Sequence, residues 1–429
     1  MARQMKDSGI EWIGEIPEDW GIHTASQLFT QVKNKNEGMQ EDNLLSLSYG
    51  KIIKKSINTT EGLLPESFEG YNIIEPNDIV LRLTDLQNDH TSLRVGLSEQ
   101  RGIITSAYLT LRNESDCFER YLYYQLHAFD ICKGFYGMGA GVRQGLNWDG
   151  IKMLKIVRPT VAEQHRIAAF LDRKCAEIDA VIERTKATIE EYKKLKQAVI
   201  TEAVTKGVRG PRPMKDSGIE WIGEIPEEWE VHQFKNIVAD VIDNRGRTPV
   251  IDENNNGIPL LELDSIGDKF PCFDKVSKYI GMESYSKFIR KDLLPGDVLF
   301  GTVGSVGKCS IVPAEANCCI AQNIVGYRFN DCQVQLFWYY YFQSKTFKQM
   351  FMQYNKGNIQ NSIKISDMAR GKVCVPSLKE QKLIVDFLDS RCAKIDAIIA
   401  KKTALLTELE TYKKSLIYEY VTGKKEVTA

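Results

Sequence analysis

Two long stretches of the chain carry apolar residues at alternating intervals of three and four. The first seam runs through Leu171, Cys175, Ile178, Ile182, Thr185, Ile189, Tyr192, Lys196 and Val199. The second runs through Leu388, Cys392, Ile395, Ile399, Lys402, Leu406, Leu409, Lys413 and Leu416. The spacing is that of a heptad repeat, and neither Pro nor Gly interrupts residues 163–206 before Gly207. The pattern predicts two long helices, and each is the obvious partner for the narrow apolar face of the other.

Both predicted helices are polar at the same two seam positions, Thr185 and Lys196 in the first and Lys402 and Lys413 in the second. Residues 163–206 would form a helix roughly 66 Å long, at about 1.5 Å per residue. If the helices lie antiparallel, we expect the Thr185/Lys402 layer of one to come near the Lys196/Lys413 layer of the other. Buried polar residues at such positions can fix the register of a helix pair.

The stretches between the long helices show a different pattern, with short apolar runs separated by turn residues. Such runs occur at 78–81, 297–300 and 318–325, and apolar strands ending in proline occur at 155–159 and 372–376. Aromatic runs at 121–124 and 336–341 fit a buried helix face. These features predict mixed α/β domains with a strand-rich core.

The chain also repeats itself. The block MKDSGIEWIGEIPE at 5–18 recurs without change at 214–227, which is 209 residues later when counted from Met5 to Met214. The start of the first long helix, 163–182, is matched by 380–399. The intervening segments are far less alike, so a constant frame carries two variable segments. The four tryptophans of the frame, Trp12, Trp20, Trp221 and Trp229, are expected to be packing anchors.

Because the second block follows the first long helix directly, the first block is expected to pack in the same way near the end of the second helix. The predicted class is α+β, with a pseudo-two-fold repeat and two mixed α/β domains separated by two long antiparallel coiled-coil helices. The expected divisions are a constant segment 1–20, a variable segment 21–160, a helix 161–207, the repeated segment 208–229, a variable segment 230–377 and a helix 378–423.

The composition excludes some classes of protein but does not by itself indicate a function. The 56 Lys and Arg nearly balance 57 Asp and Glu, so no global basic charge indicates nucleic acid, although a local basic face remains possible. The ten cysteines include no CxxC pair and are expected to be mostly reduced, partly buried thiols. No apolar run approaches the roughly 20 residues that span a bilayer, and no signal peptide is evident. We expect a cytoplasmic protein.

The repeated IEWIGEIPExW openings, two divergent segments and two EQxxIxxFLDxxxxxID helices resemble the specificity subunits of type I restriction-modification systems, over nearly the whole chain. The resemblance implies that each variable segment is a target recognition domain reading one half of a bipartite, asymmetric site in double-stranded DNA. It implies that the helices separate these domains and bind two DNA methyltransferase (M) subunits, which restriction/translocase (R) subunits join. Adenine methylation, ATP use and cleavage would belong to those other chains.

The sequence itself offers no catalytic centre, cofactor site or metal site. It has no Pro-Pro pair, as an adenine methyltransferase motif would require, and no HExxH or GxSxG motif. The segment Gly301–Cys309 lacks the Walker spacing, and Cys309 replaces the Ser or Thr that would hold Mg²⁺. A glycine-rich turn between strands, near DNA, is the preferred interpretation. His165 is expected to be a surface residue.

Candidate DNA contacts are cations and amides beside glycines, since such side chains neutralise phosphates and read base edges. The first variable segment offers Lys51, Lys54, Lys55, Arg143 and Gln144. The second offers Arg245, Arg247, Lys356, Asn358, Gln360 and Asn361. Gln144 and Gln360 occupy matching loops, which favours those two loops as contact elements.

Two other functions remain open at this point. The chain could be a coiled-coil scaffold whose variable domains bind proteins, in which case it would show no salt-dependent DNA affinity with its methyltransferase partner. It could also be the specificity subunit of a fused modification-restriction system, with the same reading role and a different partner set.

Overall fold

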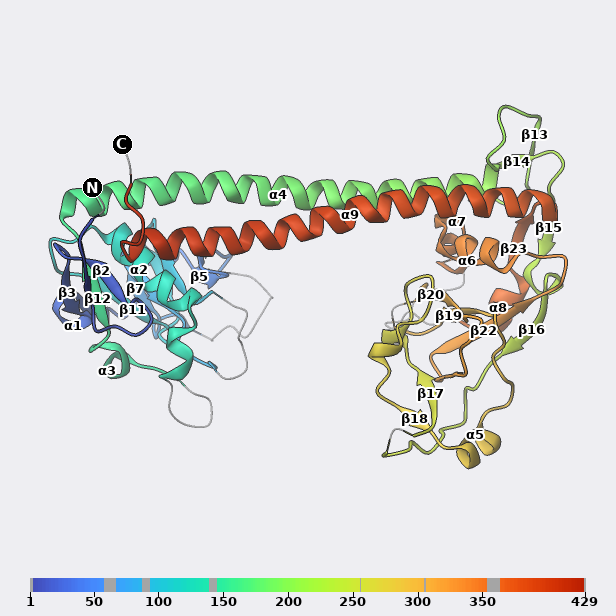
Figure 1. The fold of residues 1–429 in the computed structure, drawn as a ribbon, viewed down its shortest axis with the longest axis horizontal. Helices are drawn as coiled ribbons and strands as arrows, with labels where there is room; N and C mark the ends of the chain where they lie inside the picture. Colours follow the sequence, from blue (N-terminus) through green and yellow to red (C-terminus); the bar gives the residue numbers. More distant parts are fainter. Residues whose placement is uncertain are drawn as a thin grey trace. The chain divides into compact units, whose positions relative to one another are not determined.

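The computed structural model describes residues 3–57, 67–86, 93–138, 145–254, 256–304, 306–352 and 363–427. The chain forms two compact units (Figure 1). Unit 1 contains residues 1–185 and 404–429, and unit 2 contains residues 186–403. Each unit therefore combines one variable segment with one part of each long helix.

The two predicted long helices are confirmed. They are α4 (Val161–Lys206) and α9 (Leu378–Val421), and Gly207 ends α4 with a φ of +77°. In unit 1 the rings of Phe170 and Tyr420 lie 4.4 Å apart, and Lys413 forms an ion pair with Asp179 at 2.7 Å. Because a later residue of α4 meets an earlier residue of α9, the helices are antiparallel there.

Unit 2 shows the same arrangement. Lys196 pairs with Asp396 at 2.7 Å, and farther along the chain Arg212 pairs with Glu380 at 2.6 Å. Asp179 and Asp396 are equivalent positions of the repeat, as are Lys196 and Lys413, so each helix gives a lysine to the aspartate of the other. The expectation that Thr185 and Lys402 would face these lysines is wrong, because the aspartates six residues earlier in each helix occupy that place.

Each variable segment contains a four-stranded antiparallel sheet, and the two sheets have the same strand order. In unit 1 its order is β4 (Phe29–Gln31), β11 (Leu109–Asn113), β8 (Ile79–Leu81) and β9 (Val95–Leu97). In unit 2 the order is β16 (Val238–Ile242), β22 (Ile324–Phe329), β19 (Val298–Gly301) and β20 (Cys309–Ile311). The order is thus the same in both units although the sequences diverge.

Each variable segment begins and ends on paired strands. In unit 1, β3 (Gly21–Thr24) pairs with β12 (Lys155–Arg158), and in unit 2, β15 (Glu230–Gln233) pairs with β23 (Lys372–Val375). The aromatic runs lie on α2 (Glu119–Ile131) and α6 (Gln335–Gln343), and both are buried as expected, with Tyr121 and Phe337 fully inaccessible. The prediction of mixed domains with a strand-rich core is confirmed.

The two repeated blocks form matching β-hairpins, β1 (Met5–Asp7) with β2 (Glu15–Pro17) and β13 (Met214–Asp216) with β14 (Glu224–Pro226). Unit 1 further contains α1 (Ala25–Leu28), β5 (Leu45–Ser48), β6 (Lys51–Lys54), β7 (Asn72–Ile74), β10 (Gly102–Ile104) and α3 (Trp148–Ile151). Unit 2 further contains β17 (Ile258–Leu261), β18 (Tyr279–Ile280), α5 (Met282–Phe288), β21 (Cys319–Ile320), α7 (Lys345–Met352) and α8 (Ile365–Arg370).

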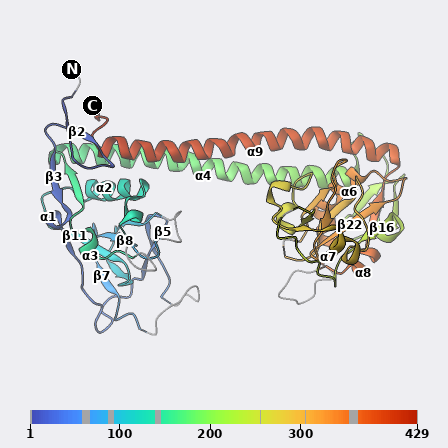
Figure 2. The ribbon, with the colours of Figure 1, turned by 60° about the horizontal axis from the view of Figure 1, so that its bottom comes forward.

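The units differ most in these further strands. In unit 1 they form two two-stranded sheets, β5–β6 and β7–β10, and a parallel bridge joins Leu44 to Ile103, whereas in unit 2 they form a three-stranded sheet in which β17 lies between β18 and β21. Figure 2 shows the first of these variable segments from another side, with β5 and β7 on the part away from β3. Neither α4, α9 nor any other helix of the described ranges is both long and apolar enough to cross a membrane. The α+β class and the repeat are confirmed.

Candidate DNA interface

A buried glutamate at the start of each long helix ties the repeated block to that helix. In unit 1 the Glu163 carboxylate accepts hydrogen bonds from Arg3 at 2.6 Å and from the Trp20 indole N–H at 3.1 Å. In unit 2 Glu380 accepts one from the indole N–H of Trp229 at 3.0 Å. We call these two arrangements, Arg3–Glu163–Trp20 and Arg212–Glu380–Trp229, the clasps. Trp20 and Trp229 are buried, so the expectation of packing anchors holds for both.

A glutamine one residue later fixes each aromatic helix. The Gln164 side chain accepts a hydrogen bond from the Phe118 N–H, just before α2, and donates one to Pro159 O. Gln381 repeats both contacts, since it accepts from the Val334 N–H before α6 and donates to Pro376 O. The backbone N–H groups at the start of α2 and α6 have no acceptor within their own helices, and these glutamines of the long helices supply one.

About two turns farther on, an aspartate of each long helix accepts a hydrogen bond from a tyrosine of the aromatic helix. Tyr124 Oη lies 2.7 Å from Asp172 and Tyr340 Oη lies 2.5 Å from Asp389. Burial raises the pKa of both phenols and the adjacent carboxylate raises it further, so both hydroxyls stay protonated and donate. Each variable segment is thus held on the long helices by the same two kinds of contact.

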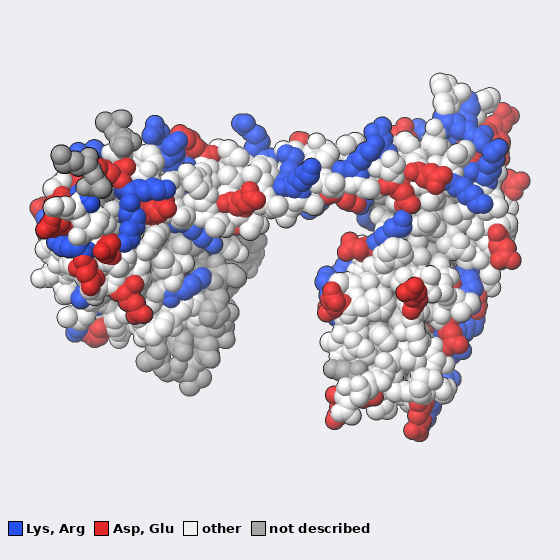
Figure 3. Space-filling model, viewed as in Figure 1, with Lys and Arg blue, Asp and Glu red and all other residues white. Residues whose placement is uncertain are grey.

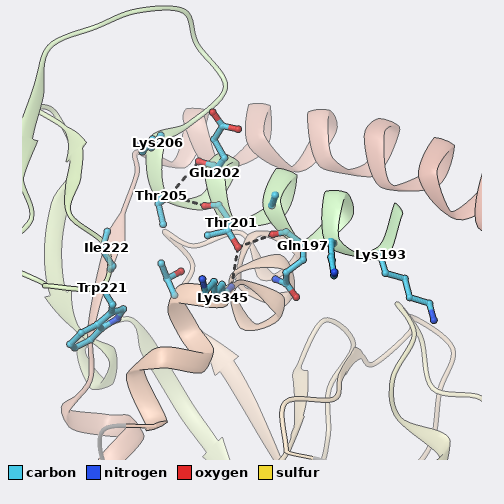
Figure 4. Close-up of a pocket in the computed structure, with 12 residues that line it drawn as sticks. Lys193, Gln197, Thr201, Glu202, Thr205, Lys206, Trp221, Ile222 and Lys345 are labelled. Carbon is cyan, nitrogen blue, oxygen red and sulfur yellow. Dashed lines mark hydrogen bonds between the residues drawn. The ribbon is translucent and has the colours of Figure 1, made fainter. Parts of the chain in front are cut away.

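The first repeated block packs against the end of α9, as expected. The Tyr418 hydroxyl donates to Trp12 O at 3.1 Å, and Lys424 donates to Glu15 O. At the equivalent place of unit 2, Thr201 replaces this tyrosine. A groove of about 810 Å³ opens there between α4, Trp221 and the start of α7 (Figure 4). Thr201 accepts a hydrogen bond from the Lys345 N–H at 2.9 Å across it. The two blocks therefore share their anchoring but present different surfaces.

The lysine cluster of unit 1 is exposed as a contact surface requires. Lys51 and Lys54 begin and end β6, and Lys55 follows directly. All three are exposed, and none forms an ion pair within the described ranges. Their charges are thus free to meet phosphate groups.

The two arginines of unit 2 are placed less simply. Gly246 between them has a φ of +81°, so a turn separates the two arginines. Arg245 makes two hydrogen bonds of 3.0 Å to the carboxylate of Asp243. Burial raises the pKa of Asp243, but the bonds from Arg245 outweigh it and the pKa lies below its ordinary value. Arg247 is exposed and donates to Lys287 O at 3.0 Å. Arg247 is therefore the more available of the two for a ligand.

The remaining six candidates lie outside the described residues. They are Arg143 and Gln144 in the first variable segment and Lys356, Asn358, Gln360 and Asn361 in the second. Both glutamine-bearing loops therefore stay predictions from the sequence.

The glycine-rich segment that resembles a phosphate loop connects two antiparallel strands. Phe300 of β19 pairs with Cys309 of β20, and Gly304 and Gly307 have positive φ values. A Walker loop leads from a strand into a helix, so the preferred interpretation as a turn between strands is confirmed. Cys309 is buried, and burial raises the pKa of its thiol to about 12. His165 is a surface residue, as expected, stacked on Phe118.

The cysteines are free thiols, seven of them buried, as expected. Across the part of the chain that the structure describes, no group of three or more His, Cys, Asp or Glu side chains is placed to hold a metal ion. On the face shown in Figure 3, Lys and Arg are interspersed with Asp and Glu along the helices. The long helices thus present mixed charge, and local features of the variable segments have to supply any basic contact.

Sequence reasoning missed the arginines of the clasps. Arg3 and Arg212 precede the repeated block and lie at the same separation as its two copies, so extending the repeat by two residues would have found them. Their role needs the structure, because nothing in the sequence joins residue 3 to residue 163.

Comparisons with known proteins agree with this organisation. Residues 226–409 match the model of the type I restriction modification DNA specificity domain. The putative type I restriction enzyme MjaX specificity subunit of Methanocaldococcus jannaschii is 25% identical, over 97% of this chain and 96% of its own. The MjaVIII specificity subunit of the same organism is 24% identical, over 96% of this chain and 94% of its own.

A solved chain from a study of complex assembly in the type I R-M system shares the fold. Its TM-score is 0.71 at 16% identity, covering 96% of this chain and 99% of that one. The repeated frame, the matched variable sheets and these likenesses agree: over nearly its whole length the chain is similar to type I restriction enzyme specificity subunits, and residues 226–409 match the DNA specificity domain of that family.

Proposed function

We propose that this chain reads a bipartite, asymmetric site in double-stranded DNA, one half with each variable segment. One observation carries the proposal. The two variable segments contain equivalent sheets and are attached to the long helices by equivalent residues, Gln164 and Asp172 in unit 1 and Gln381 and Asp389 in unit 2, while the strands beyond those sheets differ. A frame of pseudo-two-fold symmetry presents two readers to two separated half-sites. Divergent readers on such a frame suit a site whose halves are unlike.

The chain would act without catalysing a reaction and would position two methyltransferase subunits, with restriction/translocase subunits joining them. The absence of methyltransferase, nuclease and ATPase motifs from the sequence supports this division of labour. The mixed charge of α4 and α9 suits protein contacts better than a phosphate backbone. A coiled-coil scaffold with protein-binding domains is the alternative, and it predicts no DNA reading at all.

The purified chain, incubated with DNA and labelled S-adenosylmethionine, is expected to transfer no methyl group. Adding the methyltransferase subunit should produce methylated adenines within one two-part motif, which sequencing of the modified DNA identifies. The reason is that the chain lacks the catalytic motif and supplies only recognition. Turnover by the chain alone would contradict the non-catalytic role, and methylation that ignores sequence would favour the scaffold.

Exchanging residues 21–158 for the corresponding segment of another family member should change one half of the methylated motif and leave the other half intact. Each variable segment has its own sheet and its own contacts to the frame, so we expect the two readings to be independent. Sequencing methylated adenines from a host carrying the chimaera checks this. The matched control exchanges residues 230–375 and should alter the opposite half. Changes in both halves from either exchange would show that the segments do not read independently.

A further inference from the structure

The tip of the β5–β6 hairpin carries a tyrosine in an unfavourable backbone conformation. Ser48 pairs with Lys51, which leaves Tyr49 and Gly50 as a two-residue turn, with φ values of +45° and +78°. Such turns favour Asn, Asp or Gly at the first position, because a Cβ there is crowded. A tyrosine is an unusual choice, and strain of this kind is concentrated at functional positions.

Burial does not compensate for the strain. Tyr49 is 76% exposed, the largest exposed fraction of any large hydrophobic side chain within the described ranges. Burial of the Tyr49 ring within the chain therefore offsets little of the backbone strain at this position. The ring is placed for contact with something outside the chain.

The hairpin below the tip is firmly seated. Leu47 and Ile52 pack directly over Gly96 of β9, where a Cβ would lie 2.6 Å from Leu47. A Cβ on Gly50 would lie 3.0 Å from Leu93. The ring thus projects from a rigid base, as a recognition element requires.

The charge of the hairpin indicates the kind of partner. Residues 44–57 contain three lysines and no acid, in a chain of net charge −1. Lys51 lines a hollow of about 380 Å³ beside the long helices. The other cations of that hollow are already paired, Arg120 with Asp172 and Lys413 with Asp179, both at 2.7 Å. The hairpin therefore combines lysines that form no ion pair within the described ranges with an exposed ring, which suits contact with phosphates and insertion between base pairs together.

We propose that the β5–β6 hairpin is a DNA-contacting element of the first variable segment, in which Tyr49 inserts as an aromatic wedge between base pairs of the half-site while the lysines of β6 bind the neighbouring phosphates. The inference rests on the proposed function and adds a residue to it. In unit 2, β17 pairs with β18 and β21, and the described residues there show no counterpart of the β5–β6 turn, so the contact belongs to one half-site.

The test uses the complex with the methyltransferase subunit and the variant Tyr49→Asn. Asn tolerates a positive φ, so the variant should raise the melting temperature by about 1–3 °C. The same variant should weaken binding to a duplex carrying the methylated motif by about tenfold or more, since the contact of the ring between base pairs is lost. Gain of stability with loss of affinity is an outcome that a purely structural role does not produce.

Met39→Asn is the matched control, because Met39 also has a positive φ, +53°, and is 43% exposed in the same variable segment. It should raise the melting temperature and leave DNA affinity unchanged. Tyr49→Phe should retain the affinity. A duplex with 2-aminopurine in the first half-site should change fluorescence with the wild-type complex and not with Tyr49→Asn.

The outcomes separate the two proposals. If the wild-type complex binds no motif-bearing duplex, the proposed function fails. If it binds, but Tyr49→Asn binds equally well, the hairpin inference is overturned. Weakened association with the methyltransferase subunit, at unchanged DNA affinity of the assembled complex, would also overturn it and assign the tip to a protein partner.

Discussion

Replacing Glu380 with alanine should destabilise unit 2 by up to about 3–5 kcal/mol, because Arg212 loses its buried partner and keeps only the exposed carboxylate of Glu228. The Glu380 side chain is 2% exposed and that of Arg212 is 11% exposed, with 2.6 Å between Oε1 and Nη1. The indole N–H of Trp229 would lose its acceptor as well. Domains are stable by about 5–15 kcal/mol, so the loss is a large share of the total. Chemical denaturation of the purified chain measures it.

Glu228→Ala is the matched control, since Glu228 pairs with the same arginine at 2.8 Å but its side chain is 49% exposed. Exposed ion pairs contribute little because solvent screens them, so the control should leave the stability of unit 2 nearly unchanged. Hydrogen exchange in the 214–227 hairpin should rise in Glu380→Ala and not in Glu228→Ala. Equal, small losses from both variants would show that the clasp does not hold the repeated block.

Inserting one heptad into each long helix should widen the unread gap of the methylated motif by about three base pairs. Seven residues add roughly 10 Å at about 1.5 Å each, and a base pair occupies about 3.4 Å. The insertions belong between Asp179 and Lys196 in α4 and between Asp396 and Lys413 in α9. Both Lys–Asp pairs then keep their partners, and the apolar seam stays in phase. Both half-sites should be unchanged in sequence, as methylation sequencing would show.

A heptad in α4 alone is the control for this design. It displaces one Lys–Asp pair by seven residues relative to the other, so the helices cannot satisfy both, and methylation should be largely lost. Recovery of an active double-insertion complex with an unchanged gap would refute the idea that the helices set the spacing between the half-sites.

The sequence predicted those parts of the fold that repeat or have strong periodicity. The seam through Leu171 and Leu388 identified both helices, and the apolar run at 78–81 became a central strand of its sheet. The common strand order of the two sheets was not predictable, because β4 pairs with β11 across some eighty residues of divergent sequence, from Gln31 to Leu111. Such pairing depends on tertiary contacts and not on local pattern.

The candidate site was predictable in part. Lysines are mostly exposed in folded proteins, and Lys51, Lys54 and Lys55 are exposed in the structure. The engagement of Arg245 by Asp243 could not be deduced from a glycine-flanked arginine, since it depends on the side-chain geometry of the turn. The helix register was mispredicted because the seam positions alone do not show that Asp179 and Asp396, which flank the seam, attract the lysines.

The way unit 1 is assembled has a consequence for the order in which the protein matures during synthesis. Its hydrophobic core takes in Leu416, Ile417 and Val421 from the far end of the chain, and the Tyr121 hydroxyl donates to Val421 O at 3.2 Å. At about 5–20 residues per second, a ribosome needs on the order of tens of seconds to pass from residue 185 to residue 421. Unit 2 is a single continuous stretch, so it can close first. The domain made first is completed last, and a nascent chain halted before α9 ends exposes an unfinished core to chaperones and proteases.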